Sequence, residues 1–131
     1  MQTIPINSRK KVEMIDITAD VQSAVRDSGT HDGLIHLYVP HTTAAVTINE
    51  NADPDVTRDL VMELNKIVPF EDGYHHLEGN SAAHLKSSLV GVSEFIPLHK
   101  GQPVLGTWQG IYFCEFDGPR QRKLHIKVIP G

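Results

Sequence analysis

The 131-residue sequence contains a single cysteine, so no disulfide can form within the chain. A zinc site built from two or more cysteines of one chain is excluded for the same reason. Cys114 stands in the apolar run IYFCEF, where we expect a small buried strand residue. A chain of this length buries roughly two-thirds of its unfolded surface, so folding requires neither a disulfide nor a structural metal.

The sequence also lacks long apolar runs and an excess of positive charge. The N-terminal segment MQTIPINSRKKVEMIDI has no signal-peptide run, and no later segment reaches the length of a membrane span. We therefore expect a cytoplasmic protein without a membrane partner. The formal charge of −4 gives no basic surface for nucleic acid. With 40% hydrophobic and 21% charged residues, the composition is typical of one globular domain, here spanning residues 1–131.

Most of the expected strands are short runs with alternating or continuous apolar residues. They cover residues 3–7, 11–17, 33–39, 44–50, 92–98, 111–117 and 123–129. We expect the strands at 33–39 and 44–50 to pair antiparallel across the connection PHTT. We also expect the last two strands to form a hairpin through the turn residues Asp117, Gly118 and Pro119.

Three segments have helical signatures. The first runs from a Thr18 cap to Gly29, and the second begins with an Asp53 cap and Pro54. The third covers residues 81–91, with Ala82, Leu85 and Leu89 expected on its core face. The resulting order ββαββααβββ predicts an α+β fold on largely antiparallel sheet.

The eight histidines divide into two groups by their position in the chain. We expect ordinary surface or hydrogen-bonded roles for His31, His36, His99 and His125. His41 follows a strand, His75 and His76 lie in a loop, and His84 lies early in the third helix. Three imidazoles from separate elements would suit a zinc ion with one open position. The sequence does not show whether His41 reaches the others, because no compact motif such as HExxH links them.

Several other residues are candidates for either a functional or a structural role. Glu50 is a candidate general base for a metal-bound water or a solvated carboxylate at a strand end. The stretch NENADPD lacks the central glycine of a calcium loop, so helix capping explains its carboxylates. The run LGTWQG is no phosphate-binding motif. We expect Trp108 in the core, and Arg120 offers a planar fork for phosphate.

The segments HTTAAVTINENADPDVTRDL, YHHLEGNSAAHLKSSLVG and PLHKGQPVLGTWQGIYFCEFDGPR, in this order, resemble the YjbQ family, often labelled secondary thiamine-phosphate synthase. The resemblance covers the chain from about Ile15 to its end. It implies layered, largely antiparallel sheets with helices packed on one side, and a homotrimer.

The resemblance also implies a pocket near a subunit interface, with His41, His76 and His84 as ligands of a divalent metal, most favourably zinc. It places further residues nearby: Asn49, Glu50, Asp53, Gln109 and Arg120. We assign catalysis to Glu50, Gln109 and Arg120, and substrate binding to Asn49, Asp53, Trp108 and Arg120, with Arg120 at the pocket mouth.

The implied activity is a transferase reaction that joins a pyrimidine diphosphate to a thiazole phosphate, with a small phosphorylated or anionic partner. Two alternatives stay open. One is a metal-dependent hydrolase in which Glu50 takes a proton from metal-bound water. The other is a non-catalytic trimeric module that binds a small anion.

Overall fold

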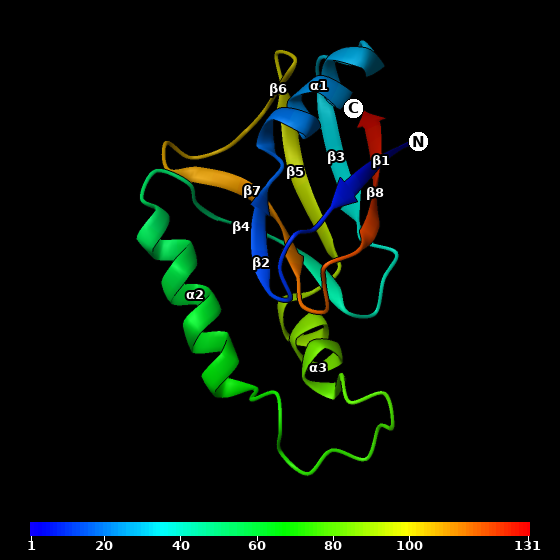
Figure 1. Ribbon diagram of the computed structural model, residues 1–131. Helices are drawn as coiled ribbons and strands as arrows, with labels where there is room; N and C mark the ends of the chain where they lie inside the picture. Colours follow the sequence, from blue (N-terminus) through cyan, green and yellow to red (C-terminus); the bar gives the residue numbers. More distant parts are fainter.

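Strands with one buried face set the architecture of the computed structural model, which describes residues 1–131 (Figure 1). The strands are β1 (Gln2–Asn7), β2 (Glu13–Asp16), β3 (Gly33–Tyr38), β4 (Ala44–Glu50), β5 (Ser93–His99), β6 (Gln102–Pro103), β7 (Gln109–Glu115) and β8 (Gln121–Pro130). The helices are α1 (Thr18–Ser28), α2 (Pro54–Ile67) and α3 (Ser81–Val90). The expected α+β order is confirmed, with the two-residue β6 as one additional strand.

The strands form two antiparallel sheets. The five-stranded sheet has the order β1-β8-β3-β5-β6, and the three-stranded sheet has the order β2-β7-β4. The main core lies between the sheets and includes Ile35, Leu37, Phe113, Leu124 and Ile126. None of the three helices is long and apolar enough to span a membrane.

Both expected hairpins are wrong. Strand β3 pairs with β5 and β8, while β4 pairs with β7 in the other sheet. Likewise β7 lies between β2 and β4, while β8 lies between β1 and β3. Because β3, β7 and β8 already have partners on both edges, the connections at residues 39–43 and 116–120 must cross between the layers. These two crossings shape the site described below.

The helices cover different parts of the sandwich. α1 closes one end of the space between the sheets, where it buries Val21, Ala24 and Val25. α3 packs on β4, and half-buried Leu64 of α2 joins a second cluster on the same outer face of the three-stranded sheet. The outer face of the five-stranded sheet carries no helix.

Two expectations about helix residues need correction. Thr18 does not cap α1, because its hydroxyl donates to Asp16 and accepts the Ile111 N–H. The buried face of α3 is Ala82, Ala83, Lys86 and Ser87, whereas Leu85 and Leu89 are exposed. The small side chains let α3 approach β4 closely enough for the Ser87 hydroxyl to donate to the Ala44 carbonyl at 2.7 Å.

The termini of α2 are as expected. The Asp53 side chain accepts the Asp55 N–H at 2.9 Å, and Pro54 occupies the first turn. No residue of α2 is fully buried, and Met62 and Ile67 are exposed. In the view of Figure 1, α2 lies along one side of the molecule, and a long loop joins its lower end to α3.

Candidate functional site

A polar groove opens where the two crossings between the layers meet the start of α3. Its volume is about 450 Å³. None of its lining residues is hydrophobic: Pro40, His41, Thr42, Thr43, His76, Glu78, Asn80, His84, Arg120 and Arg122. The crossing at 39–43 supplies four of these residues, because the chain leaves β3 in one sheet and enters β4 in the other.

All three histidines of the predicted metal site line this groove. The rings of His76 and His84 have centroids 5.4 Å apart and are nearly perpendicular. His84 lies on the first turn of α3, and His76 lies in the loop that leads into this helix. Glu78 stands beside them, with Oε2 3.9 Å from Nε2 of His76. His75, which is not one of the three predicted metal ligands, is exposed and does not line the groove.

His41 is held on the opposite wall by the backbone of β8. Its Nε2 accepts the Lys123 N–H at 2.9 Å, so the neutral imidazole carries its proton on Nδ1. Burial lowers the pKa of His41 below its ordinary value of 6.5, and the Arg122 guanidinium adds to this lowering. The neutral form is therefore favoured near pH 7.

The fit of a metal ion can be judged from these positions. Two imidazoles on one tetrahedral ion have ring centroids about 5 Å apart, and the pair His76 and His84 meets this spacing. No group of three or more His, Cys, Asp or Glu side chains stands close enough to hold a metal ion. As a third ligand, His41 would have to use Nδ1 or give up its bond from Lys123. The three-histidine metal site stays a prediction.

Arg120 lies on the rim of the groove, as expected, although no hairpin places it there. Its Nε donates to the Asp117 carbonyl, and its Nη2 donates to the Asp117 carboxylate, both at 2.9 Å. Asn80 donates to the same carboxylate oxygen, also at 2.9 Å. Asp117 thus links the start of α3 to Arg120, and Nη1 of Arg120 is left for a ligand.

Arg122 forms part of the groove floor and is bound to a buried carboxylate. It donates from Nε and Nη2 to Glu115 and from Nη2 to the Thr43 hydroxyl, and both charged side chains are almost fully buried. Burial would raise the pKa of Glu115, but hydrogen bonds from Arg122, Ser8 and the Asp117 N–H outweigh it and hold this pKa below 4.5. Both arginines are therefore paired with a carboxylate and leave Nη1 without a hydrogen bond, but the Arg120 side chain is 49% exposed and that of Arg122 only 3%. Arg120 is the more accessible cation of the groove.

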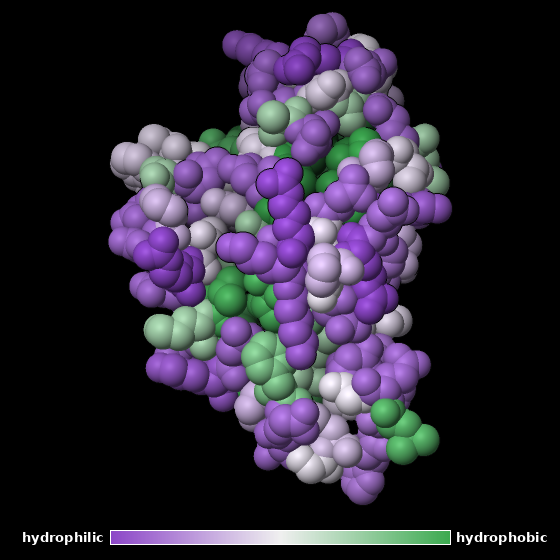
Figure 2. Space-filling view, in the orientation of Figure 1, coloured by the Kyte–Doolittle hydropathy of each residue, from purple (hydrophilic) through white to green (hydrophobic).

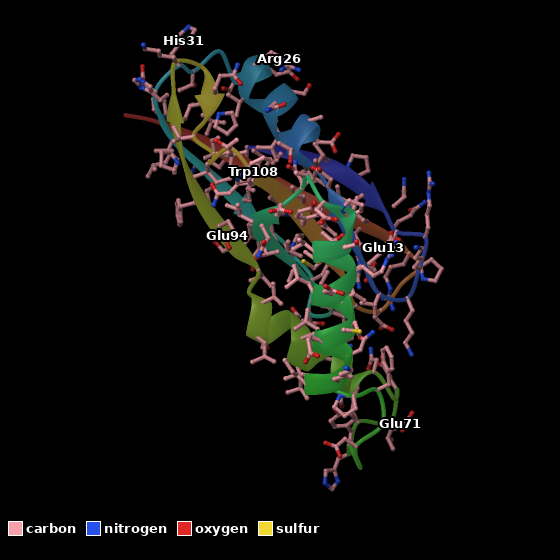
Figure 3. The ribbon with its side chains drawn as sticks, turned by 90° about the vertical axis from the view of Figure 1, so that its left-hand side faces the viewer. Glu13, Arg26, His31, Glu71, Glu94 and Trp108 are labelled. Carbon is pink, nitrogen blue, oxygen red and sulfur yellow. The ribbon has the colours of Figure 1, made fainter.

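The remaining predicted site residues lie at the other end of the molecule. Glu50 is separated from the groove by the length of β4, about 20 Å for a strand of this size. In Figure 3, Trp108 lies near the first turn of α2, whereas Glu71 marks the loop beyond its last turn, which leads to His76. Within one chain, the structure does not bring Asn49, Glu50, Asp53, Trp108 and Gln109 to the histidines.

These distant residues have local contacts of their own. Asn49 accepts the Glu50 N–H, Asp53 caps α2, and Gln109 accepts the Gly106 N–H at 2.7 Å. The core position expected for Trp108 is wrong, because 63% of this residue is exposed. We call Asn49, Glu50, Asp53, Trp108 and Gln109 the distal set.

Sequence reasoning missed several lining residues, namely Thr42, Thr43, Glu78, Asn80 and Arg122. A signal existed for Arg122, since it lies two residues before Leu124 and four before Ile126 and therefore shares their inward face of β8. The role of Asp117 was also missed, although its spacing of three from Arg120 permits their contact. For Thr42 and Thr43, no signal was available without the crossing between the sheets.

The fold and the groove define a class: a two-layer α+β sandwich with a polar, histidine-lined groove. The family model described as "UPF0047 protein YjbQ-like" matches residues 2–131, so the chain belongs to this family. It is 49% identical to the UPF0047 protein YugU of Bacillus subtilis over 130 residues, covering 98% of each chain. A UPF0047 protein of Methanocaldococcus jannaschii is 52% identical over 124 residues, which cover 95% of this chain and 90% of that protein.

Solved structures show the same fold. An uncharacterized conserved YjbQ/UPF0047 protein of Clostridium acetobutylicum superposes with a TM-score of 0.97 at 51% identity, covering 98% of this chain and 100% of that one. The conserved hypothetical protein TT1486 of Thermus thermophilus gives 0.92 at 38% identity, with the same two coverages. The expected family is therefore confirmed.

Proposed function

We propose that the groove binds the phosphate or diphosphate group of a small molecule, and that the protein is a transferase of the thiamine-phosphate synthase type. The observation that carries the binding part is Arg120 on the rim of a groove without hydrophobic lining. Its planar guanidinium keeps a free donor while Asp117 holds it in place. Bound phosphate oxygens would accept from it in charge-assisted hydrogen bonds. The reaction type comes from the family resemblance.

The chain's own residues suit such a transfer. The bond between the pyrimidine methylene carbon and the diphosphate oxygen breaks, and the diphosphate leaves with the electron pair. The lone pair of the thiazole nitrogen forms the new carbon–nitrogen bond. Arg120 stabilises the leaving diphosphate as its negative charge grows. A zinc ion held by His76, His84 and His41 would supply further positive charge as a Lewis acid.

A homotrimer would complete the site. The outer face of the five-stranded sheet carries no helix, and four large residues on it are 38–58% exposed: Leu34, Tyr38, Phe95 and Ile129. His36 stacks on Phe95 at 4.5 Å, so the face is broad and aromatic. Figure 2 shows a largely hydrophilic surface in the view of Figure 1, with apolar patches mainly along its middle. A cyclic trimer uses unlike surfaces, so the distal set of one subunit can meet the groove of the next.

A specific observation favours a hydrolase as the second candidate. Glu78 lines the groove beside His76, whereas Glu50 is far away in the same chain. Glu78 could take a proton from an attacking water, so the hydrolase needs no second subunit. The non-catalytic module remains the outcome if phosphate esters bind without turnover.

The function is tested by incubating the purified protein with the pyrimidine diphosphate and the thiazole phosphate. The expected result is thiamine phosphate and free diphosphate in equal amounts, with neither formed by His84→Ala. Release of phosphate from either precursor alone would instead indicate the hydrolase. Binding of both compounds without any product would indicate the module.

The trimer makes a prediction for light scattering. The wild-type protein is expected at about three times the chain mass of 14.5 kDa. Phe95→Lys places a charge on the exposed sheet face and is expected to give monomers, because a buried unpaired charge opposes association. Met62→Lys on α2 is the matched control and should leave the mass unchanged. A wild-type monomer, or dissociation by the control alone, would contradict the sheet contact.

The metal site makes a prediction for elemental analysis. The wild-type protein purified with zinc present is expected to retain about one ion per subunit, and His84→Ala is expected to lose it. His75→Ala serves as the control, because this exposed neighbour does not line the groove. Equal zinc content in the wild-type protein and the His84→Ala variant would remove His84 from the ligand set.

A further inference from the structure

A buried lysine lies on the helix that also carries His84. Lys86 is 0% exposed on the inner face of α3, although lysine is rarely buried without a charged partner. None of the ion pairs of the protein includes Lys86. Its Nζ donates to the side-chain oxygen of Asn65 on α2 at 2.6 Å and lies 4.4 Å from the centre of the Phe70 ring. An aromatic ring and one amide oxygen therefore compensate the buried charge.

Phe70 and Asn80 are fixed points at the two ends of the loop between α2 and α3. Besides Lys86, the ammonium group of Lys11 lies over the Phe70 ring, also 4.4 Å from its centre. At the other end of the loop, Asn80 donates to Asp117. The loop residues that line the groove lie between these two points.

The loop has few other attachments. Within residues 71–79 only Tyr74 is not exposed, and its hydroxyl donates to the Pro69 carbonyl at 2.7 Å. The Gly79 N–H donates to the His76 carbonyl at 3.2 Å, which is also a bond within the loop. No hydrogen bond links residues 71–79 to a strand or a helix. The place of His76 at the groove therefore depends on how the loop is held at its two ends.

We infer that Lys86 is a positioning residue of the groove, because its buried charge fixes Phe70 and thereby the loop that supplies His76. Lys86 itself does not line the groove, whereas His84, two residues earlier on α3, does. One helix thus provides both a wall of the groove and the attachment of the facing loop. The inference rests on the groove as the site of the proposed function and adds the residue that keeps its histidines together.

The test is nuclear magnetic resonance on the full-length protein without ligand. The rings of His76 and His84 have centroids 5.4 Å apart, so a nuclear Overhauser effect between their protons is expected in the wild-type protein. Phe70→Leu removes the aromatic face, and Lys86→Gln removes the charge but keeps a hydrogen-bond donor. Both variants are expected to lose this effect, and the backbone order parameters of residues 71–79 should fall below about 0.6.

Two control variants accompany this measurement. Phe70→Tyr keeps the aromatic face and should keep the contact between the two histidines. Leu77→Ala shortens a fully exposed apolar side chain of the same loop and should also keep it. Amide hydrogen exchange in β4 and β7 should be the same in all variants, because the effect is confined to the loop.

Zinc titration of the same proteins links the loop to the candidate metal site. Loss of a group that supports a metal ligand typically weakens metal binding about 10- to 100-fold. This loss is expected for Phe70→Leu and Lys86→Gln but not for Phe70→Tyr. If the wild-type protein binds no zinc while the histidine contact behaves as expected, the metal site is wrong and the role of Lys86 stands.

Three results would overturn the inference. The first is a wild-type protein without the contact between His76 and His84. The second is a contact that persists in Lys86→Gln. The third is faster amide exchange throughout β4 and β7 in Lys86→Gln, because it would show a general loss of stability and not a displaced loop.

Discussion

Replacing Arg122 by methionine is expected to lower the free energy of unfolding by about 3–5 kcal/mol, because it leaves the Glu115 carboxylate buried without its partner. Glu115 is 0% exposed, and Arg122 supplies two of its hydrogen bonds. Methionine keeps most of the side-chain volume, so the loss of stability reflects the unpaired charge of Glu115 and not a cavity. Chemical denaturation of both proteins at pH 7 measures the difference.

A second variant separates the buried charge from packing. The double variant Glu115→Leu with Arg122→Met removes both charges and should recover most of the lost stability. A double variant as unstable as the single one would show that shape, not charge, is responsible.

The same pair predicts how stability depends on pH. The pKa of Glu115 is held below 4.5 in the folded protein, so its contribution is fully present above pH 4.5. This contribution is lost as the pH falls through the lower folded-state pKa. The free energy of unfolding of the wild-type protein should therefore fall below pH 4.5, and less steeply in Glu115→Gln. Parallel pH profiles of the wild-type protein and Glu115→Gln would contradict this role of Glu115.

Replacing Arg120 by alanine is expected to weaken pyrophosphate binding about 10- to 100-fold. A hydrogen bond to a charged group contributes about 1.5–3 kcal/mol, and Arg120 is the more exposed of the two groove arginines. The affinity of Arg120→Lys should lie between those of the wild-type protein and Arg120→Ala, because lysine keeps the charge but not the planar fork. Isothermal titration at constant ionic strength measures all three affinities.

The control for this prediction is Arg58→Ala. Arg58 is an exposed arginine of α2 that pairs with Asp55 and does not line the groove. Arg58→Ala removes the same net charge as Arg120→Ala, so any general electrostatic effect on affinity appears in both variants. If the two variants lose affinity equally, the anion is attracted by net charge and not by Arg120.

Much of the fold follows from local sequence signals. The Asp53 cap with Pro54 and the glycine after α1 mark helix ends through backbone chemistry, and the structure confirms them. Strand pairing could not be obtained in this way. The short links at PHTT and DGPRQ look like hairpin turns, but they connect strands in different sheets. A link of that length permits either arrangement, and only the packing of the whole sandwich decides between them.

The candidate site, like the fold, was predictable from the sequence only in part. Histidine positions in a loop and at a helix start favoured His76 and His84 as neighbours, and only the family resemblance added His41. The structure places all three around one groove. The distal set was grouped with them through the family resemblance, yet β4 separates Glu50 from His41 within one chain. Spacing along a sequence contains no information on contacts between subunits. Whether the two sets meet is therefore a question about the assembly.

The central claim is that the groove binds phosphate, and nuclear magnetic resonance with added pyrophosphate tests it most directly. The backbone amide signals are assigned, and the shifts are mapped at saturation. We predict that the largest shifts belong to Thr42, His84 and Arg120, and that Arg120→Ala needs about 10- to 100-fold more pyrophosphate to produce the shifts of Thr42 and His84. Shifts confined to other surfaces, or no saturable shift at millimolar pyrophosphate, would contradict the claim.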